Sequence, residues 1–387
     1  MPSEAATQKL ISRARAAANP LPKAPTSISE INLQLVKHLL VTKRSKSQFL
    51  LFDTGGEEER VIAFGTQAGL MMLKECGRAS ADGTFWIAPK PFSQVYTIHC
   101  IADDCVFPVI FCLLNGKNES IYVKLFNEIR KLIPELLIEW LLTDFEKGAM
   151  NAAATVWPNV ALHGCFFHLT QAVYRRVCAY GLKYRYQHNE VVKKWCKYLV
   201  ALAFVPVEHV ASWFSVLLNN VGPVSTKEEA DGLLKLYDYF EQFYIGTYKY
   251  GRLQTPPRFD VVVWNCYERT RQGLPRTDNE AEVWHRAFQH FVDQSHPSTY
   301  RLIDQFGKEQ NLMEKRLLLR AAGQPFSKRY PAEEKRNSEL KKILDSFDAQ
   351  KSTSTTYIFS YLNIIVFNFF LKSDIDRDEL TSEELFN

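Results

Sequence analysis

The sequence predicts an α/β fold: a mixed five-stranded sheet flanked by helices, with an inserted all-helical subdomain. Residues 82–114 contain three strand-like segments in succession. Residues 119–165 then alternate between helix-like and strand-like segments. From residue 168 to about 266 the pattern changes to long amphipathic helices with little strand signal. That stretch is far longer than a connection within a sheet needs, so we predict that it is an insertion.

Composition limits the classes of protein to be considered. The chain has 387 residues, 46% of them hydrophobic, which is enough for a large core and more than one subdomain. A net charge of +4 permits a nucleic-acid partner without indicating one. The eight cysteines form no Cys-x-x-Cys pair, so we expect buried free thiols in a reducing compartment.

Neither end of the sequence predicts a membrane segment. Residues 1–28 lack the apolar run of a signal peptide. Residues 357–371 are strongly apolar, but a spanning helix needs about 20 such residues. We therefore expect a strand or helix packed on the core, and no membrane partner.

The first two predicted domains precede the sheet. Residues 1–47 are expected to form a disordered arm and a short helix over 30–41. The basic cluster at 43–46 fits either a nuclear signal or an ordinary surface. Residues 48–77 are expected to form a hairpin, 49–64, and a helix that Thr66 caps.

The core and the regions after it follow in order. Residues 78–168 form the first part of the predicted core. Its expected elements are strands at 82–87, 95–101 and 106–114, a helix at 119–133, a strand at 136–144, a helix at 146–156 and a strand at 160–165. The helical insertion covers 169–274, and 275–322 return to the core. The tail, 323–387, is of uncertain structure, with a loop at 325–336 and a short helix at 340–347.

The helix predicted over residues 277–294 is the best specified. Thr277 with Glu280 matches a capping box. Apolar residues recur at helical spacing, at Ala281, Trp284, Phe288, Phe291 and Val292. A further helix is expected from 301 to about 322.

Three separated acids are candidates for a divalent-metal site. Asp144 follows a mostly apolar run, 136–142, and the carboxyl end of a buried strand is where α/β sheets bind ligands. Asp82 accompanies the first strand and Glu282 lies on the best-specified helix. Each has a plainer explanation: a turn residue before Gly83, a helix N-cap, or an ion pair between Glu282 and Arg286.

Four motifs in order carry a family resemblance. They are Asp82-Gly83-Thr84-Phe85, Thr143-Asp144-Phe145-Glu146, Gly164-Cys165-Phe166-Phe167-His168 and, after a long gap, residues 279–286. From about residue 49 to about 330 the chain resembles the transposase domain of Mutator-like elements, the MULE family. The resemblance implies an RNase H-like fold, which agrees with three antiparallel strands followed by alternating helices and strands.

The resemblance also implies a chemistry. Asp82, Asp144 and Glu282 would be catalytic residues that hold two magnesium ions, with manganese as a substitute, for DNA strand cleavage and strand transfer. The partners would be transposon ends and target DNA in the nucleus, and a homo-oligomer stays open. Family members usually carry an N-terminal zinc finger, but residues 1–48 contain no cysteine. A truncated or inactive element is therefore an alternative.

Two rival functions remain at this stage. One is a non-catalytic DNA-binding or transcription regulatory protein derived from a transposase, like the far-red-response factors of plants. The other is a general RNase H-like nuclease that cuts RNA–DNA hybrids. Whether the chain is an enzyme is left open.

Further residues support the predicted site. Cys165 and His168 have the Cys-x-x-His spacing of half a zinc site, but no partner pair is obvious, so we interpret them as scaffolding. His285 would orient a carboxylate or phosphate, or lie on a helix surface. Basic residues interleaved with tyrosines suit DNA contact or a solvated helix face. They are Arg175, Arg176, Lys183, Arg185, Lys193 and Lys194, followed by Lys197.

Overall fold

The computed structural model describes residues 21–102, 105–222, 224, 226–249, 252–277, 279–292, 296–323 and 331–371. The chain divides into two compact units. The first, here the sheet unit, comprises residues 1–141, 146–161 and 279–327. The second, here the helical unit, comprises residues 142–145, 162–278 and 328–387. Most of the predicted N-terminal arm, residues 1–20, lies outside the described residues.

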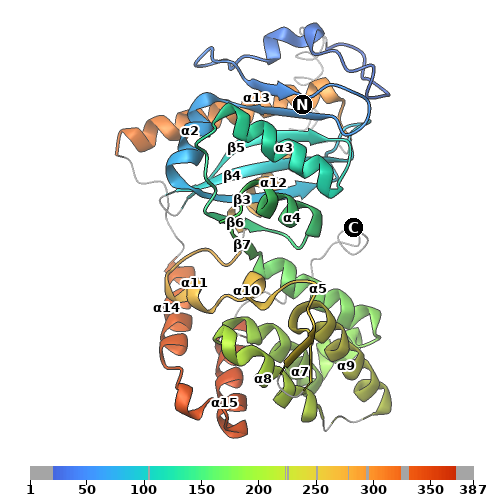
Figure 1. Cartoon of the computed structure of the whole chain (residues 1–387), viewed down its shortest axis with the longest axis vertical. Coiled ribbons are helices and arrows are strands. Elements are labelled where there is room, and N and C mark those ends of the chain that lie inside the picture. Colours follow the sequence, from blue (N-terminus) through green and yellow to red (C-terminus); the bar gives the residue numbers. More distant parts are fainter. Residues whose placement is uncertain are drawn as a thin grey trace, which may run out of the picture. The chain divides into compact units, whose positions relative to one another are not determined.

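A mixed seven-stranded sheet confirms the α/β class (Figure 1). Its order is β1-β2-β5-β4-β3-β6-β7. The strands are β1 Leu50–Asp53, β2 Val61–Gly65, β3 Arg78–Thr84, β4 Gln94–Ala102, β5 Cys105–Leu114, β6 Trp140–Thr143 and β7 Ala161–Gly164. Five strands were expected, and two more are present because β2 of the predicted hairpin pairs antiparallel with β5.

The two halves of the sheet run differently. Strands β1 to β5 pair antiparallel wherever they are neighbours, and β3 pairs antiparallel with β4. The amides of Glu139 and Trp140 both donate to the carbonyl of Gly77, so β6 begins where β3 begins. The amide of Ala161 likewise donates to the carbonyl of Glu139, so β7 begins beside β6. These bonds indicate that β3, β6 and β7 run parallel.

Helices cover both faces of this sheet (Figure 1). On one face lie α2 Gln67–Cys76, α3 Glu119–Leu132 and α4 Lys147–Val156. The rings of Tyr122 and Phe126 on α3 pack against Tyr96 of β4. On the other face lie α12 Asn279–Val292, α13 Thr299–Ala321 and the 3₁₀ helix η1 Leu33–Leu39. Because side chains alternate along a strand, Tyr96 and its neighbours Val95 and Thr97 face opposite layers.

The face under α12 and α13 has an aromatic core. Phe306 of α13 stacks on Phe111 of β5, with ring centroids 5.0 Å apart. Trp284 and Phe288 of α12 stack on each other, and Phe288 stacks on Phe306. The buried residues of η1 complete this cluster. Burial of this apolar surface therefore fixes α12 over the sheet.

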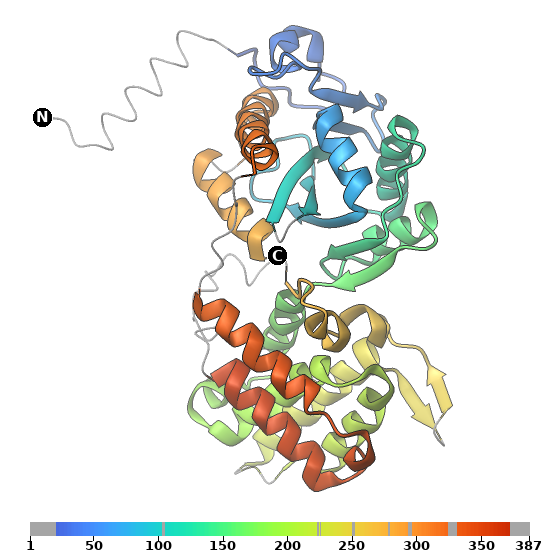
Figure 2. The ribbon, with the colours of Figure 1, turned by 90° about the vertical axis from the view of Figure 1, so that its left-hand side faces the viewer.

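The helical unit contains most of the predicted insertion. Its helices are α5 Phe166–Ala179, α6 Lys183–His188, α7 Glu190–Ala201, η2 Leu202–Phe204, α8 Val207–Asn219, α9 Lys227–Phe240, η3 Glu241–Ile245, α10 Val261–Trp264 and α11 Tyr267–Arg271. The prediction that the insertion is all-helical is wrong, because β8 Thr247–Lys249 and β9 Arg252–Thr255 form a hairpin (Figure 2, yellow). Strand β9 is exposed throughout, so no alternation of buried apolar residues marks it in the sequence.

The C-terminal part of the described chain is helical and belongs to the same unit. Its elements are α14 Pro331–Asp345, η4 Ala349–Lys351, α15 Thr355–Ile365 and the π-helix η5 Val366–Leu371. The loop expected over residues 325–336 is therefore wrong from Pro331 onward, where a proline can begin a helix. Among the described residues, every helix is too short or too polar to cross a membrane.

Candidate functional site

Asp82 lies inside strand β3, opposite Thr97 of β4. It therefore does not begin the strand, and its interpretation as a turn residue is wrong. Gly83 is a strand residue too, and a Cβ there would lie 2.6 Å from the side-chain oxygen of Gln94. The Asp-Gly pair thus reflects close packing of β3 on a buried glutamine.

Hydrogen bonds engage both carboxylate oxygens of Asp82. Oδ1 accepts from the Gly83 amide at 2.8 Å. Oδ2 lies 3.0 Å from Nδ1 of His285 on α12. Nε2 of His285 is 2.8 Å from Oγ1 of Thr97. His285 is 6% exposed and contacts the Asp82 carboxylate, so the alternative of a helix-surface histidine is wrong.

His99 lies behind this group, two residues beyond Thr97 on the same face of β4. It is fully buried, and its ring centroid is 5.8 Å from that of His285. The pKa of His99 is lowered to about 3, chiefly by burial and then by the neighbouring His285, while Asp82 acts in the opposite direction. Sequence reasoning missed Thr97 and His99. Their signal was a pair of polar residues two apart in the middle of a mostly apolar strand.

Glu282 lies on α12 in the turn before His285. Its side chain is outside the described residues, as is the side chain of Glu280 in the predicted capping box. The apolar stripe of this helix is confirmed where it is described: Ala281, Phe288 and Val292 are buried. The backbone of the third acid is therefore in a helix packed over Asp82's face of the sheet.

Asp144 directly follows strand β6. The hydroxyl of the buried Thr143 donates to Oδ1 of Asp144 at 3.3 Å. Helix α4 has Glu146 at its N-cap, so the interpretation of Asp144 as that N-cap is wrong. The carbonyl of Thr143 accepts from the amide of Cys165 at 2.8 Å. The backbone just before the acid is thus tied to the end of β7.

The residue after the acid is anchored by aromatic packing. The Phe145 ring contacts those of Tyr244 and Phe259, with centroids 5.8 and 5.0 Å away. A Cβ on Gly164 would lie 2.5 Å from Cζ of Phe145. Gly164 therefore leaves the space that the Phe145 ring fills, which gives a packing reason for the first residue of the Gly-Cys-Phe-Phe-His motif.

Cys165 is buried at the N-cap of α5, and His168 lies in the first turn of that helix. Cys266, which is also buried, has Nη2 of Arg269 2.8 Å from its sulfur. A guanidinium beside a sulfur opposes metal binding there. In the described part of the chain, no group of three or more His, Cys, Asp or Glu side chains could hold a metal.

The predicted DNA-binding residues are divided among three helices of the helical unit. On α5, the Arg176 guanidinium lies over the Tyr239 ring at 4.6 Å, an internal contact. On α6, Lys183 is exposed and Arg185 pairs with the buried Glu229 at 3.3 Å. On α7, Lys194 is exposed, whereas Lys197 is buried. The basic residues predicted to contact DNA are therefore partly used in packing.

Comparison with known families identifies part of the chain. Residues 79–172 match the family model of the MULE transposase domain. The resemblance to Mutator-like transposases is thereby confirmed over a stretch that includes Asp82, Asp144, Cys165 and His168. Glu282 and His285 lie beyond it. No curated protein and no solved structure matches the chain.

Proposed function

We propose that the chain is a Mutator-like DNA transposase with an RNase H-like core. Asp82, Asp144 and Glu282 would be its catalytic acids for metal-dependent strand cleavage and strand transfer. One observation carries the proposal: the strands that lead to the first two acids are neighbours in the sheet and begin at the same edge.

The register of these strands supports the pairing of the acids. Asp82 is the fifth residue after Gly77, and Asp144 is the fifth after Glu139, which donates to Gly77. Parallel strands advance by about 3.3 Å per residue, so equal counts lead to equal heights along the sheet. The order β5-β4-β3-β6-β7, with three antiparallel strands followed by two parallel ones, also agrees with an RNase H-like core.

The donor chemistry fits a hard divalent cation. Asp82 and Asp144 offer carboxylate oxygens, the ligands that magnesium prefers, and Glu282 would add a third. Two bound magnesium ions, or manganese, would activate the attacking oxygen and stabilise the leaving one. The part of His285 is to keep the Asp82 carboxylate turned toward α12, the helix that carries Glu282.

A DNA partner follows from the transposase match, and the finer points are part of the proposal. Transposon ends and target DNA would be the substrates, and the nucleus the place of action. The chain would act as a homo-oligomer assembled on the transposon ends. Exposed lysines such as Lys183 and Lys194 supply charge for phosphate contact.

A second candidate is a transposase-derived regulatory protein that binds DNA without cutting it. One observation favours it: both oxygens of Asp82 already have partners, Gly83 and His285. Contacts of this kind also hold a carboxylate in a protein that binds no metal, so they do not require catalysis. The two candidates therefore differ in activity and share DNA binding.

Nicking of supercoiled plasmid by the purified full-length chain tests the proposal. With magnesium or manganese, the native chain is expected to nick, and Asp144→Asn to lose at least about 100-fold in rate, because a metal ligand is gone. Asp231→Asn, an exposed acid on α9, is the matched control and should nick normally. If the folded native chain binds DNA but does not nick it, the proposed enzymatic activity is overturned and the regulatory protein is favoured.

A further inference from the structure

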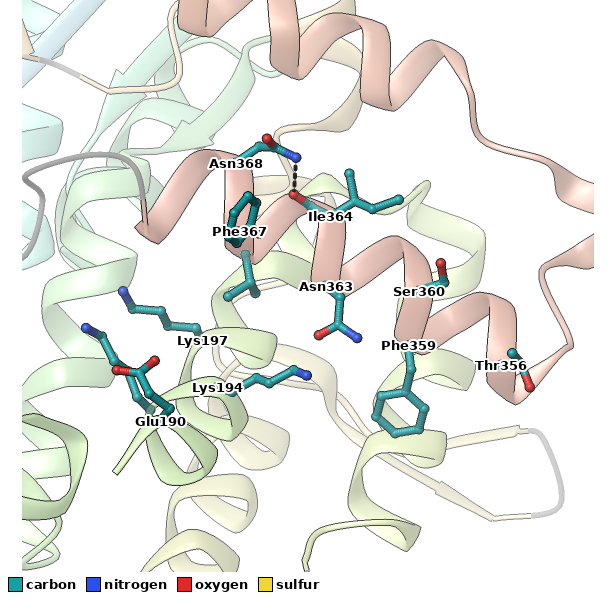
Figure 3. Close-up of a pocket in the computed structure, with 12 residues that line it drawn as sticks. Glu190, Lys194, Lys197, Thr356, Phe359, Ser360, Asn363, Ile364, Phe367 and Asn368 are labelled. Carbon is teal, nitrogen blue, oxygen red and sulfur yellow. Dashed lines mark hydrogen bonds between the residues drawn. The ribbon is translucent and has the colours of Figure 1, made fainter. Parts of the chain in front are cut away.

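A groove lies within the helical unit, between α7 and the C-terminal segment α15–η5 (Figure 3). Its volume is about 740 Å³, within the range of roughly 300–1,000 Å³ typical of small-ligand pockets. On the α7 side it is lined by Glu190, Lys193, Lys194 and Lys197. On the other side it is lined by Thr356, Phe359, Ser360, Asn363, Ile364, Val366, Phe367 and Asn368. The apolar tail thus forms one wall of a basic groove.

The α7 wall is positively charged. Three lysines line it against one acid, Glu190. Lys197 is only 4% exposed. Its ammonium lies 5.9 Å from the centroid of the Tyr186 ring. Lys194 is exposed and lies over the Tyr198 ring at 5.7 Å. A positive charge kept in a mostly buried wall strengthens attraction for an anion, because water screens it less.

The opposite wall combines rings and amides. Phe359 packs against Trp195 and Tyr198, with centroids 5.8 and 5.7 Å away, which joins the two walls. Oδ1 of Asn363 accepts from the Tyr198 hydroxyl at 2.7 Å, so the N–H donors of this amide are on its other side. Phe367 is 57% exposed. In Figure 3, Phe359 and Asn363 project from the tail toward the lysine side.

We infer that this groove binds a segment of single-stranded nucleic acid. Lys193 and Lys194 of α7 contact its phosphates, and an unpaired base packs on Phe367. Lysines beside exposed aromatic rings are the combination that binds single strands, since every base has an aromatic face. A duplex hides those faces within its stack. The inference rests on the proposed function for the identity of the ligand, but it requires neither the three acids nor a metal.

Fluorescence anisotropy with a labelled single-stranded oligonucleotide tests the groove in the full-length chain. EDTA is present, so binding is measured apart from nicking. Phe367→Ala is expected to weaken binding about tenfold. Lys194→Gln should reduce the slope of log affinity against log salt by about 0.7, as for one lost phosphate contact. Both side chains are exposed, so both variants should fold, which thermal melting checks.

Lys235→Gln is the matched control, because Lys235 is an exposed lysine on α9 of the same unit. It should leave affinity within about twofold of the native value. Equal affinity of Phe367→Ala and Lys235→Gln would overturn the inference. So would native binding that is as tight to an abasic strand or to a duplex of equal length.

The plasmid assay keeps the two proposals apart. If the native chain nicks DNA and the groove variants bind single strands normally, the transposase proposal is supported and strand binding by the groove is excluded. If the native chain nicks no DNA but Phe367→Ala loses strand binding, strand binding by the groove is supported and the proposed nicking activity is excluded. A native chain that binds no single strand excludes the groove, whatever the nicking assay gives.

Discussion

The two acids within the matched region are held in different ways. Asp82 lies within a strand, and side chains from another strand and a helix surround its carboxylate: His285 on Oδ2 and Thr97 behind it. Asp144 lies beyond the end of its strand. Its backbone is set by the bond from Cys165 to Thr143 and by the packing of Phe145 against Gly164.

This difference indicates which substitutions would displace each carboxylate. The position of Asp82 depends on a hydrogen-bonded chain that reaches α12, so a change on a distant helix can release it. The position of Asp144 depends on how closely two strands and one ring approach. Hydrogen bonds fix the first acid and sterics fix the second, so different substitutions should disturb each.

His285→Ala should have the largest effect of the variants that probe this comparison. It removes the histidine partner of a largely buried carboxylate, which costs about 3 kcal/mol or more of unfolding free energy. Urea denaturation at pH 7 measures the loss. Arg286→Ala, the exposed neighbour, is the control and should change stability by less than about 0.5 kcal/mol. Equal losses would show that the Asp82–His285 contact does not hold α12 in place.

Gly164→Ala should come next. The new methyl would meet the Phe145 ring, which is packed edge-to-face against Tyr244 and Phe259 and has little room to move. Such overpacking costs about 1–3 kcal/mol, again measured by urea denaturation. Gly307→Ala is the control: this glycine is in α13 with nothing within 4 Å of the added Cβ. It should stabilise by about 0.5–1 kcal/mol, and a similar gain at Gly164 would contradict the packing argument.

Much of the sheet could be predicted because its strands are apolar and clearly punctuated. The runs before Asp144 and around residues 95–114 lie close to the strands observed. The start of β3 could not be predicted from apolar runs, because residues 78–81 are Arg-Ala-Ser-Ala and contain no large apolar side chain. Small residues are required there, since Ala79 and Ala81 are buried in the middle of a sheet.

For the candidate site, the sequence could propose residues but not describe their surroundings. Asp82, Asp144 and His285 follow from motifs. The contact of Gly164 with Phe145 and the place of His99 depend on segments that are distant in sequence, and no local pattern encodes which segments meet. The same limit applies to the tail. Its apolar residues predicted packing, but the lysines opposite them come from α7, about 165 residues earlier.

Acid should destabilise the folded protein through His99, the buried histidine behind Asp82. His99 has a pKa of about 3 in the folded chain against 6.5 when unfolded, so only the unfolded state takes up a proton between these values. Stability from this group is present above pH 6.5 and falls with decreasing pH by about 1.4 kcal/mol per unit. His99→Leu should make the slope between pH 6 and 5 shallower by about that amount in urea denaturation series. An unchanged slope would mean that His99 is protonated or accessible in the folded chain.

Thr143→Val should have the smallest effect, and it sharpens the comparison most directly. The hydroxyl is removed from Asp144 while shape is nearly kept, so only a 3.3 Å hydrogen bond is lost. A loss of about 0.5–1.5 kcal/mol is expected, because a bond to a carboxylate at that length is modest. If backbone and ring packing hold Asp144, nicking should survive this change but not Gly164→Ala. The reverse order would mean that Asp144, like Asp82, is held through a side chain, and the contrast between the two acids would be lost.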